Sequence, residues 1–238
     1  MNGLGATYLE KNFRTLEDQN LMDFEVIVSD QSCNNDVFEL CKAWCKRLTL
    51  HHHWNLHGKR QASANVNHAL RKARGEIYKV LFQDDFILSK TVLQSIVDAF
   101  ERQDAMWLLK GSGVTRDGQT IQHPMVPRLT PKLHFGKNTV SSPSVLAFRA
   151  SSEHFFDENL IWLMDVEFYA RFWKEYGDPI ILPETLVANR LHANQVSQKI
   201  DRGVQKRELD YVLRKSASFT QISGYLEYAK RRGKTFFP

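Results

Sequence analysis

Long hydrophobic runs are absent from this 238-residue chain. None of its apolar stretches approaches the ~20 residues that a helix needs to cross a bilayer. The N-terminus also lacks the basic start and apolar core of a signal peptide. We therefore expect no transmembrane helix and a cytoplasmic location. Hydrophobic residues at 42% and charged residues at 25% are typical of one globular domain or two closely joined halves.

Cysteine is scarce as well, with three residues in the whole chain. The spacing of Cys41 and Cys45 suits one face of a helix, so reduced structural thiols are favoured over a disulfide framework. Acidic residues are outnumbered by basic ones, which gives a net charge of +5 and a pI near 9.1. This balance favours polyanionic partners: nucleotide phosphates, nucleic acid or an anionic membrane surface.

What the sequence does contain is a regular alternation of helical and extended patterns. It predicts an α/β fold with a Rossmann-like, mainly parallel central sheet flanked by helices. We expect helices at 7–19, 63–75, after Ser89 and at 163–177, and strands at 24–28, 77–82, 106–113, 145–150 and 179–190. The alternation stops from 111 to 144, and the last forty residues are expected to be helical.

The start of this pattern is unusual. The helix at 7–19 leads into the strand at 24–28 as the second half of a βαβ unit would, but only six residues precede Thr7. A buried strand and its loop do not fit in that length. The sequence therefore predicts a sheet that lacks its first strand.

Acidic side chains follow two of the expected strands. Asp30 lies just beyond the first strand, and the doublet Asp84–Asp85 lies just beyond the strand at 77–82. The carboxyl ends of strands line the ligand crevice of open α/β sheets. Two carboxylates about 4 Å apart repel by roughly 1 to 4 kcal/mol, and a divalent cation would reverse this cost. The doublet thus suggests Mg²⁺ or Mn²⁺ with a diphosphate; the alternative is a solvated acidic turn capping the next helix.

The wider pattern carries a resemblance. The segments "DFEVIVSDQS", "NVNHALRKARGE" and "VLFQDDF" resemble the nucleotide-binding half of family 2 glycosyltransferases, which have the GT-A fold. The segments "SSPSVLAFR", "FDENLIWLMDVEFYARFWKEYG" and "RLHANQVS" are similar to the acceptor side of that family. The resemblance covers roughly 8–197. It implies a nucleotide-sugar-binding half at 1–110, an acceptor-binding and catalytic half at 111–200 and a helical C-terminal tail at 201–238, all within one GT-A domain.

The resemblance also implies a set of donor-binding residues. Asp30 resembles the aspartate that hydrogen-bonds the nucleotide base, and Asn67 resembles an asparagine in the helix that lines the donor pocket. Asp84 would meet the ribose, and Asp85 the metal, Mn²⁺ or Mg²⁺. His192 would reach the metal or a phosphate, although an ordinary hydrogen-bonded histidine is an equal alternative.

Asp165 is similar in position to the general base of the family, near the start of the "LMDVEFYARF" helix. The family implies a single displacement with inversion, in which this carboxylate takes the proton of an acceptor hydroxyl. Without the resemblance, Asp165 would be interpreted as a helix N-terminal carboxylate stabilised by the macrodipole. Gln83 stands where members often carry another acidic residue, so we expect weaker metal affinity than is usual in the family.

Four histidines lie in "HHHWNLH", and His53 and His57 would share one face of a helix, as zinc ligands sometimes do. No cysteine or acidic partner stands at motif spacing. We favour a strand and loop that border the donor pocket, where Trp54 could pack, because neighbouring histidines on a strand point to opposite faces.

The C-terminal "YAKRRGKTFFP" combines four basic residues with two phenylalanines. Such a segment is compatible with peripheral contact at the inner face of a membrane, but a solvated, frayed end is favoured.

The leading functional hypothesis is a metal-dependent glycosyltransferase of polysaccharide biosynthesis. It would take a UDP-sugar as the favoured donor and a glycan or lipid-linked acceptor, with no nucleic-acid partner. Two alternatives stay open: a metal-dependent phosphohydrolase or nuclease built on Asp84 and Asp85, and a non-catalytic nucleotide-sugar-binding remnant of a transferase.

Overall fold

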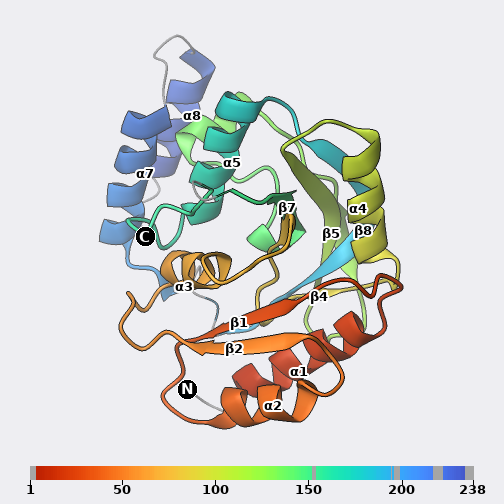
Figure 1. Cartoon of the computed structure of the whole chain (residues 1–238). Helices are drawn as coiled ribbons and strands as arrows, with labels where there is room; N and C mark the ends of the chain where they lie inside the picture. The colour runs from red at the N-terminus through yellow and green to blue at the C-terminus, as the bar shows by residue number, and fades with distance from the viewer. Residues whose placement is uncertain (1–3, 152–153, 194, 196–198, 217–221, 234–238) are drawn as a thin grey trace.

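The computed structural model describes residues 4–151, 154–193, 195, 199–216 and 222–233 (Figure 1). Its helices are α1 (Leu4–Glu17), α2 (Asp36–Trp44), α3 (Ala62–Leu70), α4 (Val92–Arg102), α5 (Met164–Tyr176), α7 (Arg202–Ser216) and α8 (Ile222–Gly233), with short 3-10 helices η1 (Pro131–Phe135) and η2 (Pro143–Val145). Its strands are β1 (Val26–Asp30), β2 (Leu50–Trp54), β3 (Ile77–Lys79), β4 (Phe86–Ile87), β5 (Trp107–Thr115), β6 (Gln122–Met125), β7 (Leu146–Arg149) and β8 (Ile180–Arg190). None of the helices in these residues has both the length and the apolar character that spanning a bilayer requires.

The strands form two separate sheets. A small sheet pairs β1 with β2, and a large sheet has the order β3-β7-β5-β8-β4 with β6 added on β5. The pairs β1–β2 and β5–β8 are parallel, whereas β3–β7, β5–β7, β4–β8 and β5–β6 are antiparallel. The α/β class is confirmed, but the sheet is mixed and not mainly parallel as we expected. Short returns such as the one between β5 and β6 permit antiparallel pairing, which needs no crossover helix.

The break between the sheets falls at β1. This strand pairs with β2 alone, and in the described part of the chain no strand precedes α1. Helices α1 and α2 cover one side of the small sheet in Figure 1. Phe13 of α1 and Trp44 of α2 are buried there with Val28 and Leu50, so the small sheet has a core of its own.

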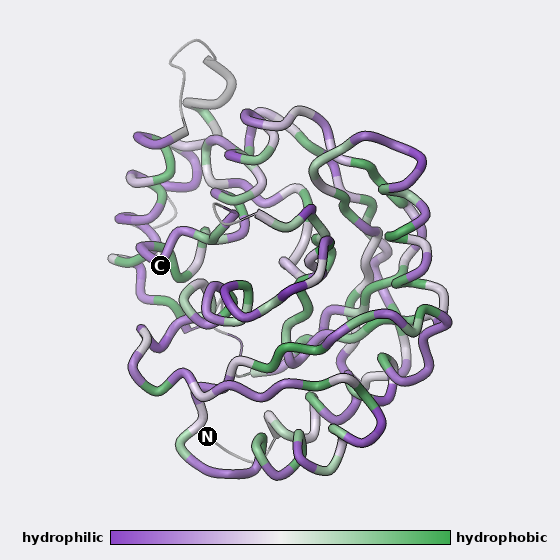
Figure 2. The backbone as a smooth tube through the Cα atoms, viewed as in Figure 1, coloured by the Kyte–Doolittle hydropathy of each residue, from purple (hydrophilic) through white to green (hydrophobic). Residues whose placement is uncertain are grey.

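A larger core lies between the large sheet and α5. Trp107 of β5 and Phe148 of β7 pack against Phe168 and Phe172 of α5, and all four are fully buried. Helix α5 ends at Gly177, whose φ of 75° is readily adopted only by glycine. Figure 2 shows strongly hydrophobic stretches along β1 and hydrophilic turns on the outer side of α7, as burial of one helix face requires.

The three cysteines are free, as expected, and Cys41 is buried. The pKa of the Cys41 thiol is raised to about 12. Burial is the main cause, and the negative charge of Asp30 is a smaller one. This thiol is therefore a structural apolar group and not a reactive one.

Candidate active site

The acidic doublet lies in a turn between β3 and β4. The strand ends at Lys79, earlier than the expected residue 82, because the Phe82 amide donates to Ser144 Oγ at 2.9 Å instead of to a neighbouring strand. Asn12 of α1 donates from Nδ2 to the carbonyls of Phe82 and Gln83 at 3.1 and 3.2 Å. Side chains from two other elements therefore hold the turn that carries the doublet.

Asp85 points inward and is 4% exposed. Its Oδ2 accepts a 2.9 Å hydrogen bond from Ser142 Oγ, and its Oδ1 accepts one of 3.2 Å from the Arg190 amide. Burial, and then the negative charge of Asp84, raise the pKa of Asp85 to about 7, against the opposing effect of hydrogen bonds from Ser144, Ser142 and the Arg190 amide. A positively charged group beside Asp85 would favour its ionised form.

Asp84 is half-buried beside His192, with 3.1 Å between its Oδ2 and the imidazole Nε2. Two residues that sequence reasoning missed complete this corner. The Arg190 guanidinium donates to the Asp84 carbonyl at 3.3 Å and lies 4.6 Å from the Tyr8 ring centroid, and Tyr8 lies 5.5 Å from the His192 ring. The only local signal was the closeness of Arg190 to His192 in the sequence.

Asp165 is the second residue of α5 and is half-buried. Its Oδ2 accepts a 2.7 Å hydrogen bond from Asn138 Nδ2, and its Oδ1 accepts the Val166 amide at 2.7 Å. Burial raises the pKa of Asp165 to about 6, although the amide and Asn138 hydrogen bonds oppose the shift; the negative charge of Glu208 adds to it. A carboxyl group with this pKa can accept a proton near neutral pH.

The chain segment at 138–142 connects the two carboxylates. Asn138 bonds both Asp165 and the Ser141 carbonyl, and the next residue, Ser142, bonds Asp85. The Tyr169 hydroxyl donates to the Ser141 and Ser142 carbonyls at 3.3 and 3.1 Å. The pKa of Tyr169 is raised by burial first and then by the charges of Asp165 and Asp85. Two carboxylates eighty residues apart in the chain are thus linked through one short segment.

The residues around the doublet fit a divalent cation that takes few protein ligands. Asp84 and Asp85 would provide carboxylate oxygens, and His192 would provide an imidazole. Burial first, and then the charge of Asp84, raise the pKa of Asp85, and a cation beside it would favour its ionised form. Within the described residues no cluster of three or more histidine, cysteine, aspartate or glutamate side chains is arranged to hold a metal. Mg²⁺ and Mn²⁺ commonly bind with one or two carboxylates and complete their shell with water and phosphate oxygens.

Asp30 lies in the small sheet, at the end of β1, and is 5% exposed. It accepts the Ser32 amide at 2.7 Å and lies 3.0 Å from His52 Nε2. Trp54 is its partner in the β1–β2 register, and Trp54 and Phe38 are both 37% exposed. The expectation that "HHHW" is a strand is confirmed, and the helical zinc arrangement of His53 and His57 does not form.

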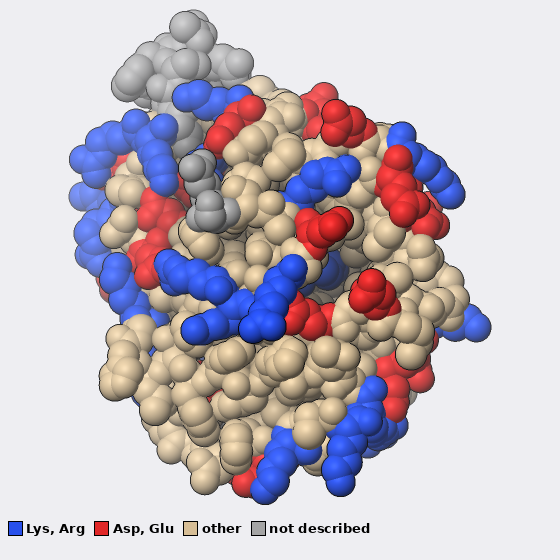
Figure 3. Space-filling view, in the orientation of Figure 1, with Lys and Arg blue, Asp and Glu red and all other residues tan. Residues whose placement is uncertain are grey.

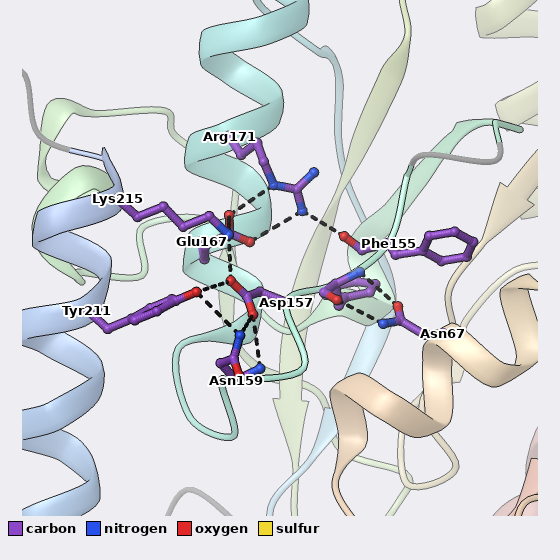
Figure 4. A network of polar contacts seen from close by, with 9 residues as sticks. Asn67, Phe155, Asp157, Asn159, Glu167, Arg171, Tyr211 and Lys215 are labelled. Carbon is purple, nitrogen blue, oxygen red and sulfur yellow. Dashed lines mark hydrogen bonds and ion pairs between the residues drawn. The ribbon is translucent and has the colours of Figure 1, made fainter. Parts of the chain in front are cut away.

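Asn67 is 1% exposed and its amide is engaged inside the protein (Figure 4). Its Oδ1 accepts the Phe156 amide, and its Nδ2 donates to the Phe156 carbonyl and to Glu158 Oε1, at 2.8, 2.8 and 2.9 Å. Both amide hydrogens are used, so in this structure the side chain anchors the 156–158 segment to α3. The resemblance had suggested a side chain that lines the donor pocket.

Charged side chains are unevenly distributed over the surface. Figure 3 shows acidic and basic groups around a hollow near the middle of one face, and Lys and Arg gathered over α7. The basic residues of α7 are Arg202, Lys206, Arg207, Arg214 and Lys215. Residues 234–238 of the basic C-terminal segment lie outside the described residues.

Solved structures of nucleotide-sugar glycosyltransferases of the GT-A type share this fold. The structure of Staphylococcus aureus TarS residues 1–349 in complex with UDP matches with a TM-score of 0.67 and 17% identity, over 98% of this chain and 69% of that one. TarS 1–349 in complex with UDP-GlcNAc matches with a TM-score of 0.67 and 15% identity, over 97% of this chain and 78% of that one. The mannosyltransferase PcManGT from Pyrobaculum calidifontis, in complex with GDP-Man and Mn²⁺, matches with a TM-score of 0.62 and 13% identity, over 98% of this chain and 67% of that one.

The chain belongs to glycosyl transferase family 2, whose family model matches residues 2–161. This confirms the resemblance, the GT-A fold and the glycosyltransferase class that the sequence suggested. Among curated proteins, none matches the sequence.

Proposed function

We propose that this protein transfers a sugar from a nucleotide-diphosphate donor to an acceptor hydroxyl, with inversion at the anomeric carbon. The observation that carries the proposal is the connection of Asp85 and Asp165 through the 138–142 segment. One carboxylate is suited to the diphosphate side of the donor, and the other to the acceptor side. The 1–110 half would bind the donor, the 111–200 half would bind the acceptor, and 201–238 would be the helical tail.

In the proposed reaction, the acceptor oxygen forms a bond to the anomeric carbon as the bond from that carbon to the diphosphate oxygen breaks. The electron pair of the broken bond leaves with the diphosphate. The acceptor proton passes to Asp165, whose pKa of about 6 leaves it largely ionised at pH 7 and still basic enough to accept a proton. Asn138 keeps this carboxylate oriented, since it donates to Oδ2.

The donor would be held at three places. Asp30 would recognise the nucleotide base, Asp84 the ribose, and Asp85 and His192 the region of the diphosphate. Bound Mn²⁺ or Mg²⁺ would supply positive charge that neutralises the leaving diphosphate. A UDP-sugar is the proposed donor, and a GDP-sugar is the competing one, because the similar structures are complexes of both kinds.

The acceptor is proposed to be a glycan or a lipid-linked saccharide. The basic surface of α7 supports approach to an anionic membrane face, since each lysine or arginine near such a surface adds about 1 kcal/mol of attraction. The proposal places the protein in the cytoplasm, in contact with such a surface.

A thermal-shift titration tests the donor part of this proposal. UDP or GDP with Mn²⁺ should raise the melting temperature of the wild-type protein, because a ligand that binds only the native state stabilises it. Asp85→Ala should abolish the metal-dependent part of the rise. Asp98→Ala, on the exposed side of α4, is the matched control and should keep it. Stabilisation by oligonucleotides alone would instead favour a nuclease, and donor binding without turnover would favour a non-catalytic binding protein.

A further inference from the structure

A buried carboxylate of the C-terminal helix α7 holds the turn directly ahead of α5. Glu208 is 5% exposed. Its Oε1 accepts the Ile161 amide at 2.8 Å, and its Oε2 accepts the amides of Trp162 and Leu163 at 2.9 Å each. Leu163 is the N-cap residue of α5 and provides no capping side-chain hydrogen bond of its own. Glu208 therefore binds, from another helix, the amide of the N-cap residue and the two amides that precede it.

Two more side chains on the same face of α7 support this attachment (Figure 4). Tyr211 and Lys215 follow Glu208 by three and seven positions, a spacing that places all three on one side of a helix. Tyr211 donates to Asp157 Oδ2 at 2.8 Å, and Lys215 lies 2.5 Å from the same oxygen and 2.9 Å from Glu167 Oε1 of α5. Helix α7 is thus fastened both to the segment before α5 and to α5 itself.

We propose that Glu208 is a positioning residue that sets the place of Asp165 for the transfer reaction. The inference rests on the proposed function, in which Asp165 is the base. Only Met164 separates Leu163 from Asp165, so the orientation of the turn at 161–163 fixes where the first turn of α5 begins. A displacement of about 1 Å in a reacting group can cost about 100-fold in rate. Holding three consecutive amides with one carboxylate restricts that displacement.

The choice of a carboxylate also has an electrostatic consequence. A neutral amide side chain could accept from these N–H groups through one oxygen only, but it would not oppose the ionisation of a second carboxyl group nearby. The negative charge of Glu208 adds to burial in raising the pKa of Asp165. Among the other titratable groups, Tyr169 on α5 interacts with the charges of both Asp165 and Asp85. Burial raises the pKa of its phenol, which therefore stays neutral. The neighbouring segments contribute Lys132 and His134 of η1, and Arg231 of α8, which lies 5.5 Å from the Trp162 ring.

The test compares Glu208→Gln with Asp210→Asn. Asp210 lies on the same helix and bonds Tyr228 and Arg232 of α8, so its replacement removes the same charge without touching the turn before α5. Hydrogen exchange should be faster at the amides of 161–163 in Glu208→Gln and unchanged in Asp210→Asn. Carbon-13 carboxyl NMR, with Asp165→Asn to assign the signal, should place the Asp165 titration midpoint at a lower pH in Glu208→Gln alone. Neither measurement needs a substrate.

Turnover supplies the kinetic side of the test. With UDP-GlcNAc or GDP-mannose as the donor, nucleotide release by Glu208→Gln should show a kcat lowered about 10-fold or more and a KM close to that of the wild type. A wild-type kcat in Glu208→Gln would overturn the proposal. If Glu208→Gln does not fold, Glu208→Asp replaces it, because aspartate keeps the charge on a shorter side chain. This variant should lower kcat and keep the titration midpoint of Asp165. A wild-type kcat in Glu208→Asp would contradict the proposal.

The outcomes also separate this inference from the proposed function. Full turnover in Asp165→Asn would remove the base assignment, whatever Glu208 does. The other outcome is that Asp165→Asn is inactive while Glu208→Gln matches the wild type in kcat and in the titration midpoint of Asp165. That result would remove only the role of Glu208.

Discussion

The two sheets of this molecule differ in how firmly they hold the residues assigned to the site. Every residue of β5 except Val114 is buried, whereas Leu50 is the only buried residue of β2. Asp85 and Asp165 are bound to segments around the large sheet, and Asp30 belongs to the small one. The groups assigned to bond making and breaking thus lie in the better-packed region, and the group assigned to the nucleobase lies in the region with the smaller core. Regions with fewer buried contacts open more readily.

The largest expected effect is at the base. Asp165→Asn should lower turnover by about 10² to 10⁴-fold and leave nucleotide-induced stabilisation nearly unchanged, because an amide keeps the contact to Asn138 and cannot accept the proton. Wild-type turnover should fall as the pH drops through about 6, where Asp165 becomes protonated. Steady-state kinetics across pH 5 to 8 would check both; an active Asp165→Asn would contradict the base assignment.

Core truncations compare the two sheets directly. Leu109→Ala in β5 should lower the free energy of unfolding by about 2 to 5 kcal/mol, since it leaves a cavity in the fully buried core. Leu50→Ala in β2 should cost less, about 1 to 2 kcal/mol, because the smaller core can relax more easily. Urea unfolding monitored by circular dichroism gives both values. An equal or reversed order would mean that the small sheet is as firmly packed as the large one.

The buried Asp85 carboxylate is expected to lower the stability of the metal-free protein above neutral pH. Its pKa of about 7 in the folded protein lies above the ordinary 3.8, so the native state retains a proton that the unfolded state releases. In metal-free buffer the free energy of unfolding should therefore decrease as the pH rises from about 4 to about 7. Asp85→Asn should remove this decrease and stabilise the metal-free protein at pH 8 by on the order of 1 kcal/mol or more. Thermal melts in EDTA would check it; lower stability of Asp85→Asn at pH 8 would contradict the buried-charge explanation.

The smallest effect is expected in the small sheet. Asp30→Asn should weaken nucleotide binding by about 10-fold, the scale of one hydrogen bond to a charged group, and leave kcat nearly unchanged. Calorimetric titration with UDP and with GDP would also show which base is preferred. His53→Ala, on the same sheet but with its side chain on the face opposite to His52, is the control and should bind as the wild type does. A large loss of kcat in Asp30→Asn would mean that the two regions act as one.

Local patterns predicted the elements whose signals are contained within one segment. The apolar spacing and the glycine stop of "LMDVEFYARFWKEYG" gave α5 and placed Asp165 in its first turn. The apolar run at 106–109 predicted the start of β5, because a strand buried on both faces needs no alternation. The position of the acidic doublet beyond β3 was predicted on the same grounds.

Features that depend on contacts between distant segments were not predictable. The strand directions of the large sheet depend on how the 111–144 segment returns, and this stretch has few local signals. Ser142 and Asn138 lie in that same stretch, so their bonds to Asp85 and Asp165 could not be anticipated. Glu208 appears in the sequence as one charge among many on α7, and only the folded chain brings it to 161–163.

A crystal structure of the protein with UDP-GlcNAc or GDP-mannose and Mn²⁺ would show whether Asp85 and Asp165 face the two ends of the reacting bond. Anomalous scattering would locate the metal. We expect Mn²⁺ about 2.0 to 2.2 Å from an Asp85 oxygen, the diphosphate between Asp85 and His192, and the anomeric carbon on the side of Asp165. A nucleotide bound away from the doublet, or a sugar that Asp165 cannot reach, would contradict it.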